Sequence, residues 1–188
     1  MDIYDAIYGR RSIREFEERA VGRDVLDRII EAASEAPSSK NEQPWHFHVA
    51  TGRTRELVGQ EMALSTVHLQ EYLDSLPPDH METVERFFAT LGGAPVAIAL
   101  SVPVTPDDST RINHYLAAGC ALQNLQLAAY AEGLGCCNLT FGFWVRDKLA
   151  DTLGVPADRE IISLVILGHP AETPESKPRH GDIVSYYE

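Results

Sequence analysis

One stretch near the middle of the chain constrains the fold more than any other. Alanine and leucine dominate residues 116–131, which follow a predicted helix start near Ser109-Thr110. Strong polar groups in this stretch are confined to Gln123, Asn124, Gln126 and Tyr130. A helix that is apolar nearly all round is buried on every side. Two interpretations stay open: a central helix of the chain's own core, or a helix buried against a second subunit as well.

The rest of the chain mixes helices and strands without strict β-α-β alternation. Periodicity and turn residues predict helices at 3–9, about 24–36 and 145–153, and strands at 46–50, 96–102 and 161–167, with another after Gly133. This pattern favours an α+β fold with a mixed central β-sheet flanked by helices. We expect one domain over residues 1–188, with a helical excursion at about 53–91, interrupted by Pro77-Pro78, and an extended tail at about 171–188.

Composition excludes several classes of partner. The net charge of −12 argues against nucleic acid and against an anionic membrane, because both select a basic surface. Three cysteines, two of them adjacent, do not form a disulfide framework. The first residues lack the features of a signal peptide, and no stretch has the length of a membrane span. We therefore expect a cytoplasmic protein.

Two polar segments are suited to binding a ligand. The first runs from Pro37 to Trp45, and its small polar residues leave hydroxyls, amides and backbone N–H groups free. The second is Arg10-Arg11-Ser12-Ile13-Arg14, whose arginines suit a phosphate. An alternative for the arginines is that they complement the C-terminal dipole of a first helix that ends near Gly9.

A third basic segment, Lys177-Pro178-Arg179, lies near the end of the chain. It is interpreted either as part of an unstructured, solubilising tail or as a second set of cations for the same phosphate.

Other catalytic and binding motifs are incomplete. Gly133-Leu134-Gly135 lacks the third glycine of a dinucleotide fingerprint. His46 and His48 share a strand face, but no carboxylate or cysteine joins them, so we predict no metal site. Cys136 and Cys137 are interpreted as packing residues. We therefore predict no catalytic side chain.

Taken in order along the chain, these segments resemble the nitroreductase-like flavoproteins, particularly their compact members. Arg10-Arg11-Ser12 with Arg14 resembles the family's N-terminal phosphate motif, and residues 37–47 resemble its ligand loop. Gln123-Asn124-Leu125 with Gly133-Leu134-Gly135 resembles the central helix and its exit, and Leu167-Gly168-His169-Pro170 resembles the C-terminal block.

The resemblance implies an intertwined homodimer with FMN at the subunit interface. It also implies reduction of a small-molecule electron acceptor, such as a nitro compound or a quinone, by NADH or NADPH in a ping-pong mechanism. The alternatives are a specialised flavin enzyme of the dehalogenase or flavin-cleaving type, a non-catalytic FMN-binding or storage protein, and a structural dimer without ligand.

The resemblance also assigns residues to parts of FMN. Arg10, Ser12 and Arg179, with Arg11 and Lys177, would bind the phosphate, and Arg14 would lie at the pyrimidine side of the ring. The ligand loop of the partner subunit would reach the ribityl chain through Pro37, Ser38, Ser39, Asn41 and Gln43. The backbone of Leu139, Thr140 and Phe141 would donate to the flavin nitrogen that receives hydride. Phe87 and Phe88 would shape the substrate pocket.

Overall fold

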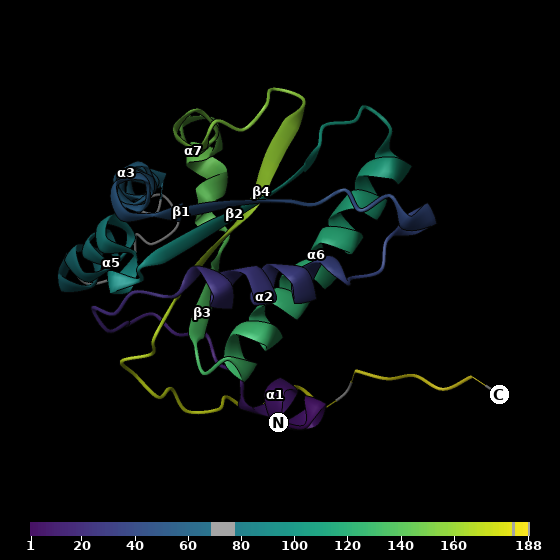
Figure 1. Ribbon diagram of the computed structural model, residues 1–188, viewed down its shortest axis with the longest axis horizontal. Helices are drawn as coiled ribbons and strands as arrows, with labels where there is room; N and C mark the ends of the chain where they lie inside the picture. The colour runs from purple at the N-terminus through teal and green to yellow at the C-terminus, as the bar shows by residue number, and fades with distance from the viewer. Residues whose placement is uncertain (69–77, 182, 188) are drawn as a thin grey trace.

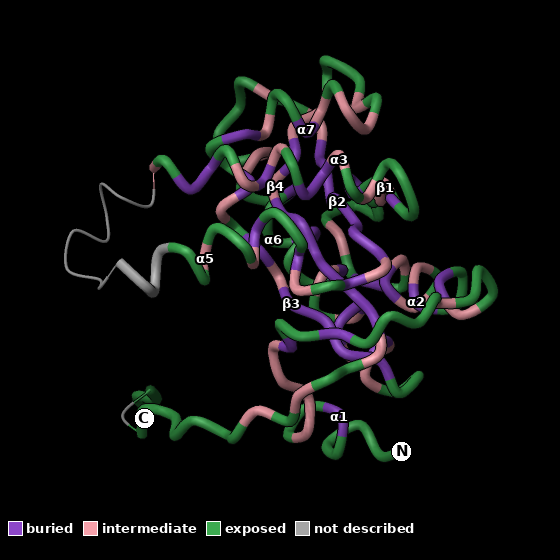
Figure 2. The backbone as a smooth tube through the Cα atoms, turned by 90° about the vertical axis from the view of Figure 1, so that its left-hand side faces the viewer, coloured by how far each residue is buried: buried purple, intermediate pink, exposed green. Residues whose placement is uncertain are grey.

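Four antiparallel strands form the centre of the structure, a computed structural model that describes residues 1–68, 78–181 and 183–187. The strands are β1 (His46–Thr51), β2 (Val96–Pro103), β3 (Gly135–Leu139) and β4 (Arg159–Gly168), in the order β1-β2-β4-β3. All three strand pairs are antiparallel. The two inner strands are apolar and buried (Figure 2), because helices cover both faces of the sheet.

Helices α2 (Arg23–Ser34) and α6 (Asp108–Ala131) cover one face, and α3 (Gly52–Ala63), α5 (Pro78–Thr90) and α7 (Arg146–Leu153) cover the other (Figure 1). Side chains alternate along β2 in agreement with this. Val96 and Ile98 pack in the core beneath α2 and α6, whereas Ala97 and Ala99 pack beneath α3 and α7. The α+β fold class predicted from the sequence is confirmed, but the sheet of the described strands is antiparallel and not mixed.

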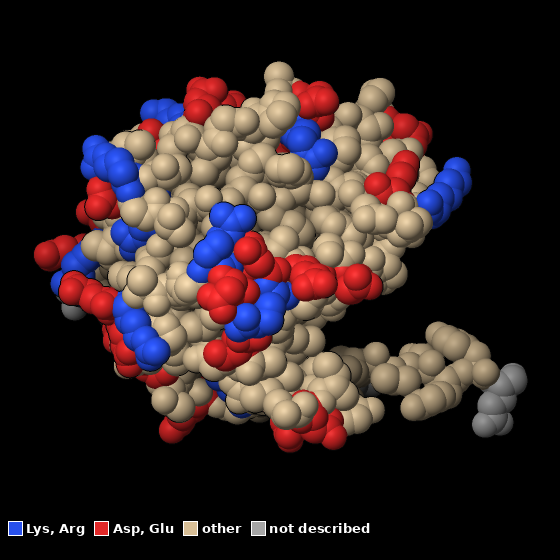
Figure 3. Space-filling model, viewed as in Figure 1, with Lys and Arg blue, Asp and Glu red and all other residues tan. Residues whose placement is uncertain are grey.

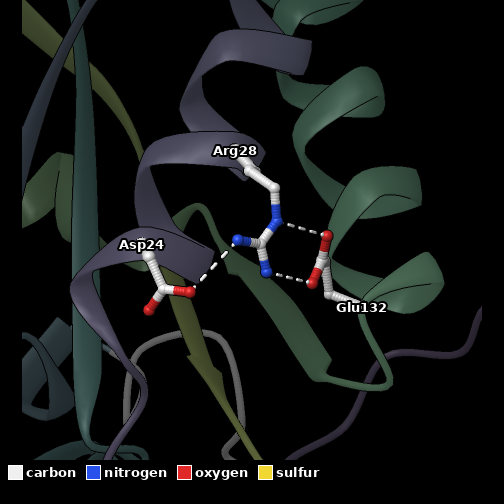
Figure 4. A network of polar contacts seen from close by, with 3 residues as sticks. All are labelled: Asp24, Arg28 and Glu132. Atoms are coloured by element: carbon white, nitrogen blue, oxygen red, sulfur yellow. Dashed lines mark hydrogen bonds and ion pairs between the residues drawn. The ribbon is translucent and has the colours of Figure 1, made fainter.

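Polar contacts join the two helices of the first face at their ends. Arg28 on α2 donates from Nε and Nη2 to the carboxylate of Glu132, just after α6, at 2.9 and 2.8 Å (Figure 4). Its Nη1 also donates to Asp24, at 3.1 Å. Acidic and basic side chains lie next to one another over the α2 surface (Figure 3).

The described parts of residues 53–91 include core positions, which their weak periodicity did not indicate. Val58 and Met62 on α3 and Leu91 in the 3-10 helix η2 (Leu91–Gly93) have no exposed surface. They belong to the core beneath α3, α5 and α7. The expected interruption includes Pro77, which lies outside the described residues.

The two ends of the chain run close to each other before they separate. The short helix α1 (Ile3–Gly9) leads into residues 10–17, which lie between the edge of β3 and the segment after β4. The C-terminal residues then leave the body of the molecule (Figures 1 and 2), and all those described after Pro174 are exposed. None of the helices in the described part of the chain has the length and apolar character needed to cross a membrane.

Candidate active site

The arginine segment is held along the edge of β3 by backbone hydrogen bonds. Ser12 forms an isolated parallel bridge with Cys136, and Ile13 N donates to the Cys136 carbonyl at 3.0 Å. Farther along, Phe16 N donates to the Gly92 carbonyl at 3.0 Å. A Cβ on Gly92, at φ +63°, would overlap the Arg14 carbonyl oxygen, so glycine is required for this approach.

A cavity of about 700 Å³ lies beside this segment and brings two predicted positions together. Arg14 and Phe141 both line it, with Phe87 and Phe88 from α5. The Phe87 and Phe88 ring centroids are 5.4 Å apart, and those of Phe88 and Phe141 are 5.7 Å apart. The cavity thus combines a row of aromatic rings with charged side chains of both signs, the cations being Arg14 and Arg86, and the rings suit a flat ligand.

The remaining residues predicted near Phe141 lie at the end of β3. Leu139 is the last residue of the strand and is buried, whereas Thr140 is exposed and precedes the 3-10 helix η3 (Phe141–Val145). Thr140 and Leu139 do not line the cavity, but their backbone leads directly into it.

Arg10 and Arg11 line a smaller cavity of about 220 Å³ with the start of the C-terminal segment. Arg11 Nη1 donates to the carbonyls of Tyr8 and Arg10, at 2.7 and 2.9 Å. This contact supports the interpretation that Arg11 complements the C-terminal end of α1. Among the described residues the guanidinium of Arg10 has no hydrogen bond or ion pair, so it remains available for a ligand.

The predicted ligand loop lies elsewhere in the same chain. Glu42 in this loop is 3.7 Å from Nε2 of His114 on α6, whereas Gly9 packs against the ring of Tyr130 on the same helix. His114 and Tyr130 are 16 residues apart, which is about 24 Å along a helix. The structure therefore does not bring Pro37, Ser38, Ser39, Asn41 and Gln43 to the arginine segment of their own chain.

The loop is held in an uncommon backbone conformation. Lys40, Asn41 and Gln43 all have positive φ, between 47° and 57°, although none is glycine. Gln43 N donates to Ser38 Oγ at 3.0 Å, and Arg159 Nη2 donates to the Pro44 carbonyl at 2.6 Å. Backbone strain of this kind clusters at functional sites, where the surrounding contacts maintain it.

Lys177 and Arg179 lie in the exposed C-terminal tail. In the described part of the chain, neither side chain has a hydrogen bond or ion pair. Only the first residues of this segment, Pro170 and Glu172–Pro174, reach the cavity of Arg10 and Arg11. The convergence of the two basic segments therefore stays a prediction.

Sequence reasoning missed Glu172, which lines both cavities, and Arg159, which anchors the loop. A glutamate in a tail and an arginine at the start of a strand are ordinary surface residues in a sequence. No motif marked either one, because their roles depend on contacts with residues far away in the chain.

The two thiols of β3, of which Cys136 lines the smaller cavity, are buried as expected of packing residues. Burial raises the pKa of Cys136 to about 12, and it also raises the pKa of Cys137, so both thiols stay protonated at neutral pH. His48 Nε2 lies 2.9 Å from Ser101 Oγ. Within residues 1–68, 78–181 and 183–187, no three His, Cys, Asp or Glu side chains are grouped to hold a metal ion.

A second cavity of about 700 Å³ lies between α2 and β1. Apolar side chains such as Leu26, Ile30 and Phe47 line much of it, and none of the predicted site residues does. The candidate active site is therefore the cavity that contains Arg14 and Phe141.

Comparisons with known proteins show which family the chain belongs to. The model of the Nitroreductase family matches residues 7–169. Nitrobenzene nitroreductase from Ectopseudomonas oleovorans is 28% identical over 200 residues, covering 88% of this chain and 86% of that protein. Iodotyrosine deiodinase from Haliscomenobacter hydrossis is 27% identical over 178 residues, covering 91% and 80%.

Among solved structures, the FMN and NADPH-dependent nitroreductase NfnB from Sphigopyxis sp. strain HMH has the same fold. Its TM-score is 0.83 at 24% identity, and the match covers 100% of both chains. The family match includes Arg14 and Phe141, which line the candidate site. The chain belongs to the nitroreductase family.

Proposed function

We propose that the protein is an FMN-dependent oxidoreductase that uses NAD(P)H for two-electron reduction of nitro compounds, quinones or similar electrophiles. The observation that carries this proposal is the cavity of about 700 Å³ in which Arg14 lies beside the aromatic residues Phe87, Phe88 and Phe141. A ping-pong mechanism follows if donor and acceptor use this cavity in turn.

The types of residue around the cavity are suited to FMN. When bound, FMN supplies the redox chemistry, accepting a hydride from NAD(P)H and delivering two electrons to the acceptor. Arg14 offers a cation for the pyrimidine edge, where it stabilises negative charge. Arg10 and Ser12, four and two residues before Arg14 in the same segment, offer donors for the phosphate. The backbone of Leu139–Phe141 supplies donors at the ring.

The position of the ligand loop supports a homodimer. Within one chain, the loop and the arginine segment lie toward opposite ends of α6 (Figure 1). A second copy of the chain brings its own loop to the site, with Ser38, Ser39 and Asn41 directed to the ribityl chain. Lys177 and Arg179, together with Arg11, would then complete the phosphate site.

The comparisons support the same function. One relative is named for reduction of nitrobenzene, and NfnB is described as FMN- and NADPH-dependent. The family match over residues 7–169 includes the arginine segment and the ligand loop.

The proposal is tested with the purified protein under anaerobic conditions. We expect flavin absorption bands, bleaching of these bands by NADH or NADPH, and recovery when a quinone is added. If FMN is bound tightly but neither NADH nor NADPH bleaches its absorption bands, the protein is a storage protein and the proposal is wrong.

The similarity to a deiodinase keeps a dehalogenase as the second candidate. Iodide release from iodotyrosine, measured with a halide electrode, separates this candidate from the nitroreductase. Turnover of nitrobenzene or a quinone without iodide release supports the first proposal. Iodide release at a higher kcat/KM than quinone reduction supports the second.

A further inference from the structure

We propose that Glu172 is a positioning residue for Arg14: its carboxylate fixes the backbone from which the Arg14 guanidinium reaches the flavin. The inference rests on the proposed function, because Arg14 acts on the flavin only if FMN occupies the cavity. It concerns a residue that no motif of the sequence marked.

The contact is made by a single carboxylate oxygen. Glu172 Oε1 accepts hydrogen bonds from the backbone N–H groups of both Arg14 and Glu15, the latter at 3.3 Å. Glu172 is half-buried and lines the cavity of Arg14 as well as that of Arg10. A charged acceptor on two successive backbone donors is stronger than a neutral one.

The chain on either side of these two donors is already fixed. Ile13 N is bonded to the Cys136 carbonyl and Phe16 N to the Gly92 carbonyl, each at 3.0 Å. Between these points, Glu172 alone accepts from the backbone N–H groups of Arg14 and Glu15 in the described structure. Removing its carboxylate therefore releases a short, specific part of the segment.

The segment that carries Glu172 has its own backbone anchors. Ala171 N donates to the Glu15 carbonyl and Glu17 N donates to the His169 carbonyl, each at 2.9 Å. Pro170 and Phe16 form an antiparallel bridge. These bonds do not involve the Glu172 side chain, so a substitution there leaves the two segments paired.

Arg14 depends on this backbone for its position. Its side chain is exposed, and its hydrogen bond in the described structure is a long one, from Nη1 to the Ser12 carbonyl at 3.4 Å. It has no ion pair among the described residues. Since no side chain among the described residues holds the guanidinium, the backbone of residue 14 decides the point from which it reaches into the cavity.

A positioning role for Glu172 and a purely electrostatic role predict opposite changes in the reduction potential of the flavin. A cation held at the pyrimidine edge favours reduced over oxidised FMN, so releasing Arg14 lowers the reduction potential. A bare carboxylate near the cavity disfavours the reduced anion, so removing that charge raises the potential. The sign of the change therefore separates the two roles.

The experiment measures the midpoint potential of bound FMN in wild type, Glu172→Ala and Glu172→Gln. For Glu172→Ala we expect about a tenfold loss in the preference for reduced flavin, about 30 mV more negative for a two-electron couple. For Glu172→Gln we expect no lowering, because the amide oxygen accepts from both N–H groups. Glu175→Ala, three residues away and outside both cavities, is the matched control and leaves the potential unchanged.

Four results overturn the proposal. They are a raised potential in both Glu172 variants, no change in either, an equal lowering in both, or an equal change in Glu175→Ala. If Glu172→Ala does not fold, Glu172→Met replaces it, and a lowered potential in Glu172→Gln still contradicts the positioning role. A wild-type protein without FMN overturns the proposed function first, so the two failures are distinguishable.

Discussion

Neighbouring arginines in this chain have different surroundings. Arg11 donates to two carbonyls at the end of α1, whereas Arg10, half-buried beside Cys136 and Tyr130, has no partner in the described structure. The residue types are the same, so the sequence could not distinguish them. The distinction comes from the turn after Gly9, which directs Arg11 back toward its own helix.

We predict that Arg10→Ala weakens FMN binding about 10- to 100-fold, because a lost charge-assisted hydrogen bond costs about 1.5–3 kcal/mol. Arg11→Ala is expected to affect FMN less and to destabilise α1 instead. The dissociation constant is measured by fluorescence titration of the apoprotein. Arg53→Ala, on the surface of α3, is the control; equal weakening in all three variants contradicts the assignment.

His48 makes stability depend on pH. Burial, then the charges of His46 and Arg159, lowers its pKa to about 4 from the ordinary value of 6.5. Between these values the unfolded chain binds a proton that the folded chain does not, so stability falls as the pH falls from about 6.5 to 4. Because His48 is partly exposed, screening by solvent limits this loss of folding free energy to about 1–2 kcal/mol.

His48→Gln is therefore expected to flatten the pH dependence in this window while keeping a polar contact to Ser101. Urea unfolding at pH 4.5, 5.5 and 7 measures the slope. His180→Gln, in the exposed tail, should retain the wild-type slope. A wild-type slope in His48→Gln as well means that another group titrates.

At the scale of elements, the surroundings of α6 bear on the two interpretations of its sequence, a core helix of one chain or a helix buried against a second subunit as well. Ala117, Ala118 and Ala121 are buried against the sheet, as a core helix requires. Ile112 and Leu116, however, are 58% and 65% exposed, on the side that also carries Gly119 and Cys120. Residues 112–131 of α6 contain no Asp, Glu, Lys or Arg, which supports the second interpretation, burial against another subunit.

We predict that Leu116→Glu converts the proposed dimer to a monomer, because a buried, unpaired carboxylate costs several kcal/mol. Size-exclusion chromatography with light scattering, over a range of concentrations, measures the mass. Leu64→Glu, at the exposed end of α3, introduces the same charge and should stay dimeric. A Leu116→Glu dimer as tight as wild type would place the interface elsewhere.

The elements themselves were largely predictable from the sequence. Continuous apolar runs gave β2 and β4, and Gly154, in the left-handed conformation, ends α7 where its sequence position indicated. The packing of α3 was not predictable, because Val58 and Met62 are buried by contacts with elements far away in the chain. The same contrast holds for the site. Sequence motifs predicted Arg14 and Phe141, whereas Glu172 reaches the site through the pairing of segments that are far apart in the sequence.

At the scale of the whole molecule, the C-terminal tail has apolar side chains that stay exposed in a single chain. It carries Ile183, Val184, Tyr186 and Tyr187, all more than half exposed. Large apolar side chains grouped on an extended segment are typical of a binding segment. We expect this tail to lie against the partner in the proposed dimer and to place Lys177 and Arg179 at the phosphate of FMN.

We predict that Lys177→Ala/Arg179→Ala weakens FMN binding at least tenfold but leaves the dimer intact, because it removes two charges and none of the apolar residues. Its remaining affinity should depend less on salt than that of wild type. Deleting residues 176–188 should weaken FMN binding as much and also weaken the dimer, while the core, which contains none of the described residues beyond 175, stays folded. Arg53→Ala/Lys148→Ala, which removes two surface cations outside both cavities, is the control. If the Lys177/Arg179 variant retains FMN at every salt concentration, the tail is a solubilising segment, and Arg10 and Ser12 bind the phosphate without it.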